Sequence, residues 1–297
     1  MTDLPLRLAA APISWGVCEV PDWGYQLPPA RVLVEMRDLG ITATETGPPG
    51  YLPTDPDAMR AMLSRYGLGC VGAFAPVVAH EPGHDPVPGI AGTLDRLVAS
   101  GGDVLVLAAA TGRDGYDSRP ELDAQGWSTL LANLDRLVAA ATARGVRAVL
   151  HPHVGTMVEQ RPEVYRVLDD SCVPLCLDTG HLLVGGTNPA EVTAYAAERV
   201  GLVHLKDVRG ALAARVHSGD LGYTDAVRAG MYVPLGAGDT GIAGIVAALL
   251  AAGYDGWFVL EQDRVLASEA DGDCAAADVA ASIGHLRATC ERIGVTA

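Results

Sequence analysis

Residues 126–150 read Gly-Trp-Ser-Thr-Leu-Leu-Ala-Asn-Leu-Asp-Arg-Leu-Val-Ala-Ala-Ala-Thr-Ala-Arg-Gly-Val-Arg-Ala-Val-Leu, and they hold one helix and one strand. Over 126–144 the apolar residues recur every three or four positions, which predicts an amphipathic helix. Gly145 follows, and glycine commonly ends helices because it adopts a left-handed backbone conformation without strain. Residues 146–150 are a short, mainly apolar run, typical of a strand covered on both faces. This order of elements indicates an α/β protein with a parallel sheet.

The helix and strand pair recurs along the whole chain. Short apolar runs predict strands at 8–14, 42–46, 69–75, 103–108, 146–150, 173–177, 200–205 and 256–260. Amphipathic segments predict helices at 29–39, 55–66, 90–100, 126–144, 161–170, 189–199, 241–252 and 275–293. Eight units in 297 residues are typical of a (β/α)8 barrel, so we expect a single TIM-barrel domain over 1–297. A doubly wound sheet is the alternative, but the turn at 14–18 carries no GxGxxG pattern.

The stretch 207–235 interrupts this alternation. It follows the seventh predicted strand and is longer than an ordinary connection. Because a TIM barrel keeps its active site at the C-terminal ends of its strands, we expect this insertion to lie on the active-site side.

The composition narrows the range of partners. With 21 Lys and Arg against 36 Asp and Glu, the net charge is −15, which opposes binding to nucleic acid or to an anionic membrane. No apolar stretch is long enough for a membrane span, and residues 1–5 do not resemble a signal peptide. The six cysteines include no CxxC pair, so we expect reduced thiols. These features predict a cytoplasmic protein with a small-molecule substrate, and a homodimer is compatible with the fold.

Polar residues gather where the predicted strands end. His151 follows the fifth strand, Asp178 follows the sixth, His204 lies in the seventh and Glu261 follows the eighth. In a barrel these ends meet at one mouth, where two imidazoles and two carboxylates would surround one point. Such a set suits a divalent metal with open positions for substrate and water. Mn²⁺, Co²⁺, Fe²⁺ or Mg²⁺ match these ligands, and Zn²⁺ is compatible although no thiolate is placed to favour it.

The neighbouring polar residues each fit more than one role. His153 and His181 are expected to orient the ligands, while Asp178 would also serve as the N-cap of a helix. Lys206 is either a surface side chain or a cationic group that points into the mouth. The Gly-rich stretch 235–239 is either a phosphate cradle or a tight turn. Expected substrate contacts are Trp15, Arg209, Arg228 and Glu45, and for Glu45 a simple rim carboxylate is the alternative.

The motifs around these residues resemble the xylose-isomerase-like TIM barrel superfamily. The matching segments are His151 at strand five, Leu175-Cys-Leu-Asp178-Thr-Gly-His181, Val203-His-Leu-Lys-Asp207 and Leu260-Glu261. Three stretches are similar to its inosose dehydratase branch, namely His151-Pro-His153-Val-Gly-Thr156, Ala11-Pro-Ile-Ser-Trp15 and Arg228-Ala-Gly-Met-Tyr-Val-Pro234. Many epimerases and isomerases of the superfamily carry Glu at strand five, where this chain has His151.

The resemblance implies a metal-dependent lyase of inositol catabolism. Its substrate would be 2-keto-myo-inositol (inosose) or a similar keto-polyol, its cofactor Mn²⁺ or Co²⁺, and its product a trihydroxycyclohexanedione formed by loss of water. Glu261, Lys206 or His153 would take the proton next to the ketone, and His181 or Lys206 would protonate the leaving hydroxyl. A metal cation nearby is expected to lower the pKa of Lys206.

Other functions fit parts of this pattern. A sugar or ketose isomerase or epimerase would use the same metal site, although with His151 at strand five it lacks one of its two carboxylate bases. Phosphodiester cleavage is disfavoured by the acidic charge. A barrel that only binds is disfavoured by four ligand types at four strand ends.

Overall fold

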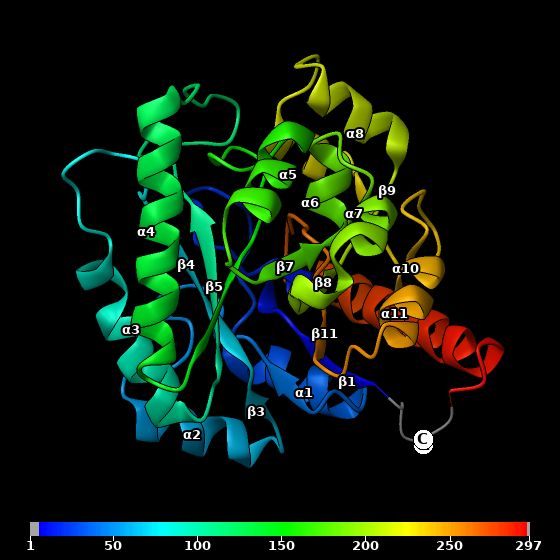
Figure 1. Ribbon diagram of the computed structural model, residues 1–297. Coiled ribbons are helices and arrows are strands. Elements are labelled where there is room, and N and C mark those ends of the chain that lie inside the picture. Colours follow the sequence, from blue (N-terminus) through cyan, green and yellow to red (C-terminus); the bar gives the residue numbers. More distant parts are fainter. Residues whose placement is uncertain (1–5, 296–297) are drawn as a thin grey trace.

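The computed structural model describes residues 6–295, and its centre is a parallel sheet (Figure 1). The strands of this sheet are β1 (Arg7–Ala10), β2 (Ala43–Thr44), β3 (Gly69–Cys70), β4 (Gly72–Val77), β5 (Val104–Ala109), β6 (Arg147–Leu150), β7 (Leu175–Asp178), β8 (Val200–Leu205) and β11 (Trp257–Leu260). Their hydrogen-bonding order is β3-β2-β1-β11-β8-β7-β6-β5-β4.

The two ends of this order meet at Val71. It is the single residue between β3 and β4, which therefore form one barrel strand with a break. Val71 donates its N–H to the carbonyl of Thr44 in β2 at 2.9 Å, and its own carbonyl accepts from Val104 in β5 at 3.1 Å. The strands thus close into the predicted (β/α)8 barrel, and the doubly wound alternative is wrong.

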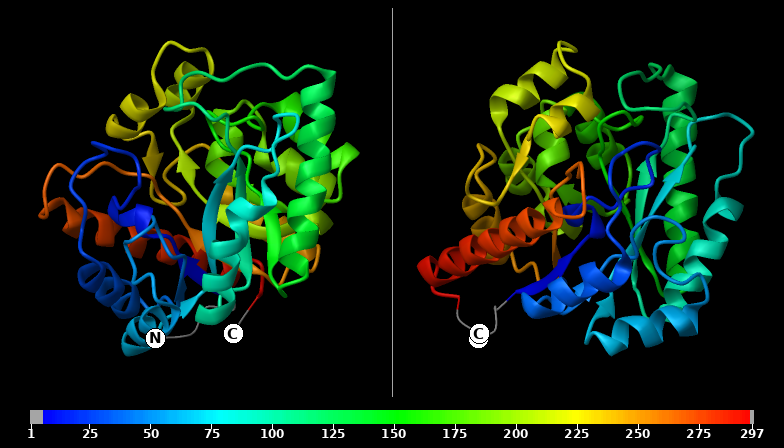
Figure 2. Two further views of the ribbon diagram at one scale, coloured as in Figure 1. Left: turned by 90° about the vertical axis from the view of Figure 1, so that its left-hand side faces the viewer. Right: turned by 180° about the vertical axis from the view of Figure 1, so that it is seen from behind.

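Helices cover the outside of the barrel (Figure 2). They are α1 (Pro29–Asp38), α2 (Pro56–Arg65), α3 (Val87–Ser100), α4 (Ala124–Thr142), α5 (Arg161–Asp170), α6 (Thr179–Val184), α7 (Pro189–Ala196), α10 (Ile242–Ala251) and α11 (Asp271–Arg292). Gly145, after α4, has the left-handed φ of 74° that its position in the sequence predicts. Within residues 6–295 no helix is long and apolar enough to cross a membrane.

The structure corrects several predicted boundaries. The first strand ends at Ala10, because Pro12–Trp15 form a 3-10 helix, η1, rather than extended backbone. The helix predicted over 189–199 ends at Ala196 and continues as a 3-10 turn, η2 (Ala197–Arg199). The short helix α6 begins directly at the end of β7 without a connecting loop, and it is the helix that the N-cap alternative for Asp178 requires.

Alternation along the strands separates two apolar layers. Side chains that face the helices form the larger core, for example Leu105, Leu107 and Leu177. Side chains that face the barrel axis form a smaller inner core, for example Val149, Cys176 and Val259. Because successive side chains of a strand point to opposite faces, the residue two positions after an inner one also points inward. That rule places polar side chains at the mouth, directly above the inner core.

Residues 207–235 form their own small structure on the side of the strands' C-terminal ends (Figure 1). They comprise β9 (Asp207–Val208), α8 (Gly210–His217), α9 (Tyr223–Arg228) and β10 (Tyr232–Val233). β9 and β10 pair antiparallel, with Tyr232 opposite Val208. Tyr223 and Tyr232 are buried and belong to an apolar cluster of this segment.

Candidate metal centre and active site

Four side chains from four neighbouring strands meet at the barrel mouth. His151 follows β6, Asp178 ends β7, His204 lies in β8 and Glu261 follows β11. One ligand atom from each lies within 4.8 Å of the others. His151 Nε2 is 3.0 Å from Asp178 Oδ2, and His204 Nδ1 is 2.6 Å from Glu261 Oε2. The structure therefore brings the four predicted ligands into one group that could hold a metal ion.

Asp178 combines the two roles that its position in the sequence suggested. Its Oδ1 accepts the backbone N–H groups of Gly180 at 2.9 Å and His181 at 2.7 Å, which caps α6. Its Oδ2 lies 3.0 Å from His151 Nε2 and 3.7 Å from His204 Nδ1. One oxygen thus fixes the carboxylate, and the other points into the ligand group.

Unpaired polar atoms indicate that a cation fits this group. His204 Nδ1 and Glu261 Oε2 are buried, and within the described part of the chain neither makes a hydrogen bond. They nevertheless lie only 2.6 Å apart. Buried polar atoms are almost always hydrogen-bonded, so two facing atoms that make only ion-pair contacts are what a bound metal ion would explain.

The charge balance at the mouth favours a cation as well. Asp178, Asp263 and Glu45 are at most 7% exposed, and the Glu261 side chain is 14% exposed. Lys206, only 2% exposed, is the ammonium group that faces Asp178, Asp263 and Glu261. Buried carboxylates without enough positive charge are costly, and a divalent ion would offset most of this excess.

The surroundings hold these carboxylates in the ionised form that a metal ligand needs. Burial raises the pKa of Asp178, but Lys206 and His181 outweigh burial and hold the pKa well below its usual range. Burial also raises the pKa of Glu261, yet His204 and Lys206 lower it to about 2. The pKa of His204 is raised well above its ordinary value, since burial is outweighed by Cys176, Glu261 and Glu45.

A thiol that was not predicted also lies close to this group. Cys176 Sγ can be grouped with the ring nitrogens of His151 and His204. Burial raises the pKa of this thiol to about 11, so it stays protonated at neutral pH. A protonated thiol is a poor ligand, which leaves the two-imidazole, two-carboxylate set as the favoured one.

Lys206 is the centre of a buried hydrogen-bond network. Its Nζ donates to Asp263 Oδ1 at 2.7 Å and to His181 Nε2 at 3.1 Å, and it lies 3.3 Å from Glu261 Oε2. Tyr223 from α9 donates to Asp263 Oδ2 at 2.6 Å, and the Tyr232 hydroxyl lies 3.1 Å from that of Tyr223. The segment 207–235 thus reaches the site through two tyrosines.

The carboxylates around Lys206 shift its pKa in the direction opposite to the lowering predicted for a nearby metal cation. Burial lowers the pKa, but Asp178, Asp263 and Glu261 outweigh burial and hold it well above the ordinary value. The prediction took into account the effect of a metal cation on the pKa of Lys206, but not the opposite effect of the Asp263 carboxylate. A signal for the importance of Lys206 was present in the sequence, because it is the only lysine of the chain.

His153 and His181 lie beside the ligand group with their rings packed together. Their centroids are 3.7 Å apart. His153 Nδ1 donates to the Val154 carbonyl at 2.7 Å, so its Nε2 carries the lone pair. Burial, together with His151 and Lys206, lowers the pKa of His153 to about 3, which keeps the ring neutral.

Glu45 contacts His204, one of the candidate metal ligands. Its Oε1 lies 2.8 Å from His204 Nε2, and a carboxylate in this position fixes the imidazole so that Nδ1 faces the metal group. Glu45 also lines the cavity at the mouth.

A cavity of about 210 Å³ opens beside the ligand group. One side of it is polar and includes His151, His153, Lys206, Glu261 and Asp263. The other side is mainly apolar and includes Pro12, Ile13, Val17, Trp23, Pro48, Pro49, Phe74 and Pro76. Glu19, in the loop after β1, is a further carboxyl group of the lining. Tyr116 and Tyr223 complete the wall.

Three predicted substrate contacts lie elsewhere. Trp15 is fully buried, and its Nε1 donates to Glu35 of α1 at 2.7 Å, so it packs between barrel and helices. Arg209 is exposed and donates to the Gly230 carbonyl at 3.0 Å. Arg228 is exposed beside Asp225. None of these three is among the described residues that line the cavity.

The Gly-rich stretch 235–239 is not a free phosphate cradle. Asp207 Oδ2 accepts the N–H groups of Gly236 at 2.7 Å and Gly238 at 3.1 Å, and its Oδ1 accepts that of Thr240 at 3.1 Å. A carboxylate of the chain itself therefore occupies the position that a phosphate would take.

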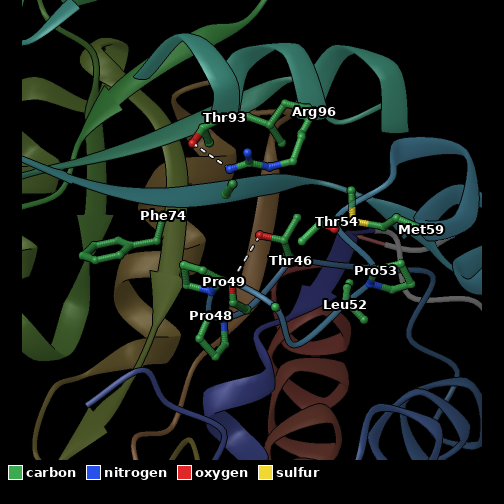
Figure 3. Close-up of a pocket in the computed structure, with 14 residues that line it drawn as sticks. Thr46, Pro48, Pro49, Leu52, Pro53, Thr54, Met59, Phe74, Thr93 and Arg96 are labelled. Carbon is green, nitrogen blue, oxygen red and sulfur yellow. Dashed lines mark hydrogen bonds between the residues drawn. The ribbon is translucent and has the colours of Figure 1, made fainter. Parts of the chain in front are cut away.

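A second cavity, of about 190 Å³, lies on the other side of the turn at Pro48 and Pro49 (Figure 3). Its lining includes Thr46, Met59 and Arg96, but no histidine or carboxylate among the residues that the structure describes. This second cavity therefore lacks the imidazole and carboxylate groups that line the first one.

Comparison with known proteins agrees with this geometry. Residues 33–288 match the family model described as xylose isomerase-like TIM barrel. The chain belongs to this family. An inosose dehydratase of Geobacillus kaustophilus (strain HTA426) is 32% identical over 273 residues, which cover 88% of each chain. The rhizopine catabolism protein MocC of Rhizobium meliloti is 32% identical over 270 residues, covering 88% of this chain and 82% of that protein. The resemblance predicted from the motifs is confirmed.

Two solved structures share the fold at low sequence identity. L-ribulose 3-epimerase has a TM-score of 0.69 at 17% identity, covering 97% of this chain and 95% of its own. The IolI protein with a bound zinc atom has a TM-score of 0.69 at 14% identity, covering 97% and 98%. At these identities the likeness concerns the barrel alone.

Proposed function

We propose that this chain is a metal-dependent dehydratase that removes water from 2-keto-myo-inositol or a closely similar keto-polyol. The observation that carries the proposal is the position of Lys206 Nζ. It is a buried proton donor 3.3 Å from Glu261 Oε2, at the edge of the candidate metal group and in the wall of the cavity. Similarity to several inosose dehydratases over most of the chain supports the same reaction.

The residues that would hold the metal are His151, Asp178, His204 and Glu261. A divalent ion bound by them would supply Lewis-acid polarisation of the substrate ketone. Mn²⁺ or Co²⁺ is our proposal for the ion, because mixed imidazole and carboxylate ligands suit them. A cytoplasmic place of action belongs to the same proposal.

Two side chains are positioned to move the protons of the elimination. His153 Nε2, which carries the ring's lone pair, takes the proton from the carbon next to the ketone. Lys206 Nζ gives a proton to the hydroxyl on the following carbon. The electron pair of the broken C–H bond forms the new C=C bond as the C–O bond breaks, and the hydroxyl leaves as water. His181 and Asp263 act through Lys206 as positioning residues, because both hold its Nζ.

Dehydration fits the cavity better than epimerisation. An epimerase that moves a proton between the two faces of an enediolate needs a base on each face. Here the lining outside the ligand group and the Lys206 network is mainly apolar and includes Pro12, Ile13 and Pro76. Its carboxyl groups are Glu45, which contacts His204, and Glu19.

The test is product analysis with metal-loaded protein and 2-keto-myo-inositol in D₂O. We expect loss of one water by mass spectrometry and the ultraviolet absorbance of a conjugated enol. Incorporation of deuterium into recovered substrate or an isomer, without loss of water, would instead establish the epimerase or isomerase.

A further inference from the structure

The apolar half of the cavity is built by strands that the proposed chemistry does not use. Phe74 and Pro76 lie two positions apart on β4 and therefore point to the same side of the barrel wall. The residues between and beside them, Ala73, Ala75 and Val77, belong to the core under the helices. Phe74 and Pro76 accordingly face the mouth, where both line the cavity.

Phe74 is exposed although it lies in a barrel strand. It is one of only two phenylalanines, and 36% of its surface is accessible, whereas its strand partner Val106 is fully buried. Its ring is perpendicular to that of His151, with the centroids 6.1 Å apart. The ring points away from Thr54 and Met59 of the second cavity (Figure 3). Phe74 thus presents an apolar surface directly beside a candidate metal ligand.

Apart from His151 and His153, whose ring centroids lie 6.1 Å and 6.2 Å from that of Phe74, the lining around this surface is rich in proline. Pro48, Pro49 and Pro76 share the cavity lining with it, and proline carries neither a polar side chain nor a backbone N–H. A hydroxyl buried against such a surface loses its hydrogen bonds to water and gains none, which is unfavourable. A C–H group at the same place is well accommodated.

A six-membered keto-polyol presents two different kinds of surface, and this difference matches the cavity. Equatorial hydroxyls project from the rim of the ring, whereas the two ring faces carry the axial substituents. In 2-keto-myo-inositol all five hydroxyls are equatorial, so both faces carry only C–H groups. An epimer with one axial hydroxyl has a polar group on one face.

We propose that Phe74 is a specificity-determining residue that selects keto-polyols with a hydroxyl-free ring face. This inference rests on the proposed function, since it takes the ketone to be bound at the polar half. The ring then lies with one face against Phe74 and Pro76, and its hydroxyl rim meets the polar residues. An axial hydroxyl on the face toward Phe74 is rejected by about 10-fold to 100-fold, the range that one unpaired polar group produces.

The experiment compares 2-keto-myo-inositol with its epimer at the carbon opposite the ketone, which leaves the reacting carbons unchanged. The ratio of the two kcat/KM values is measured for the native protein and for Phe74→Leu, Phe74→Ala and Phe74→Asn. We expect the native ratio to be kept by Phe74→Leu, to fall about 10-fold in Phe74→Ala, and to fall further in Phe74→Asn, whose amide can bind the axial hydroxyl. Tyr195→Ala, which removes a 54% exposed aromatic side chain from α7, is the control and should keep the native ratio.

The possible outcomes distinguish a failure of the role proposed for Phe74 from a failure of the proposed dehydratase function. If the native protein dehydrates neither ketone, the proposed function is wrong. If it dehydrates both at the same kcat/KM, or if Phe74→Ala and Phe74→Asn keep the native ratio, the role of Phe74 is wrong while the dehydratase stands. Thermal unfolding of each variant shows whether it is folded. If Phe74→Ala is not folded, the ratio measured for Phe74→Asn alone tests the role of Phe74.

Discussion

The polar half and the apolar half of the barrel mouth have the same strand geometry but present different kinds of side chain. In the polar half, β6, β7, β8 and β11 each place a titratable side chain just above the inner core. In the apolar half, β1, β2 and β4 and their loops present mainly proline, isoleucine and phenylalanine. Catalysis requires charges at fixed positions, whereas recognition of a ring face requires a surface without hydrogen-bonding groups. Substitutions in one half should therefore alter the reaction and substitutions in the other half the selectivity. Four substitutions test this separation.

Loss of a ligand in the polar half should have the largest effect. Asp178→Asn keeps the N-cap acceptor of α6 but removes the charge that faces the metal group. We expect kcat/KM to fall about 1,000-fold or more, because the cation supplies several kcal/mol of transition-state stabilisation. Metal content measured by mass spectrometry should fall in parallel. Full activity with undiminished metal content would show that Asp178 is only a helix cap.

Removal of the proton donor should come next. Lys206→Met should lower kcat by about 100-fold to 10,000-fold, the range of general acid catalysis. The same variant should lose much less on an analogue with fluorine in place of the leaving hydroxyl, since fluoride departs without a proton. Equal losses on both substrates would remove Lys206 from the departure of the hydroxyl.

The link from segment 207–235 to the site should contribute less. Tyr223→Phe deletes the hydroxyl that donates to Asp263 at 2.6 Å but keeps the ring in place. We expect kcat to fall about five-fold with KM unchanged, in line with the net value of one hydrogen bond. Tyr232→Phe, which loses only a contact to Tyr223, is the matched control and should change kcat less. A change confined to KM would assign Tyr223 to substrate binding instead.

The smallest effect is expected in the apolar half. Glu19→Gln should change the rate of dehydration by less than about three-fold, because Glu19 plays no part in the two proton transfers. Steady-state rates with 2-keto-myo-inositol are the measurement. A loss of 100-fold or more would mean that a second base works on this side, as an epimerase requires.

Sequence patterns predicted the polar half far better than the apolar half. A histidine or carboxylate that ends an apolar run is conspicuous, so His151, Asp178, His204 and Glu261 were identified from position alone. Phe74 and Pro76 have the composition of ordinary core residues, and only the break at Val71 and the closed barrel show that they face the mouth. Tyr223 was not predicted because its place depends on the path of residues 207–235 across the barrel. The sequence did not indicate the direction of Trp15, because the backbone turns into η1 after Ala11 and directs that side chain to α1.

Metal titration of the stripped protein during turnover tests the central claim most directly. Mn²⁺ is added stepwise to a known concentration of protein in the presence of 2-keto-myo-inositol, and water loss is followed by the absorbance of the enol product. We expect no product without metal, and a rate that rises in proportion to bound Mn²⁺ until one equivalent per chain is reached. Product formation at the same rate with and without metal would contradict it.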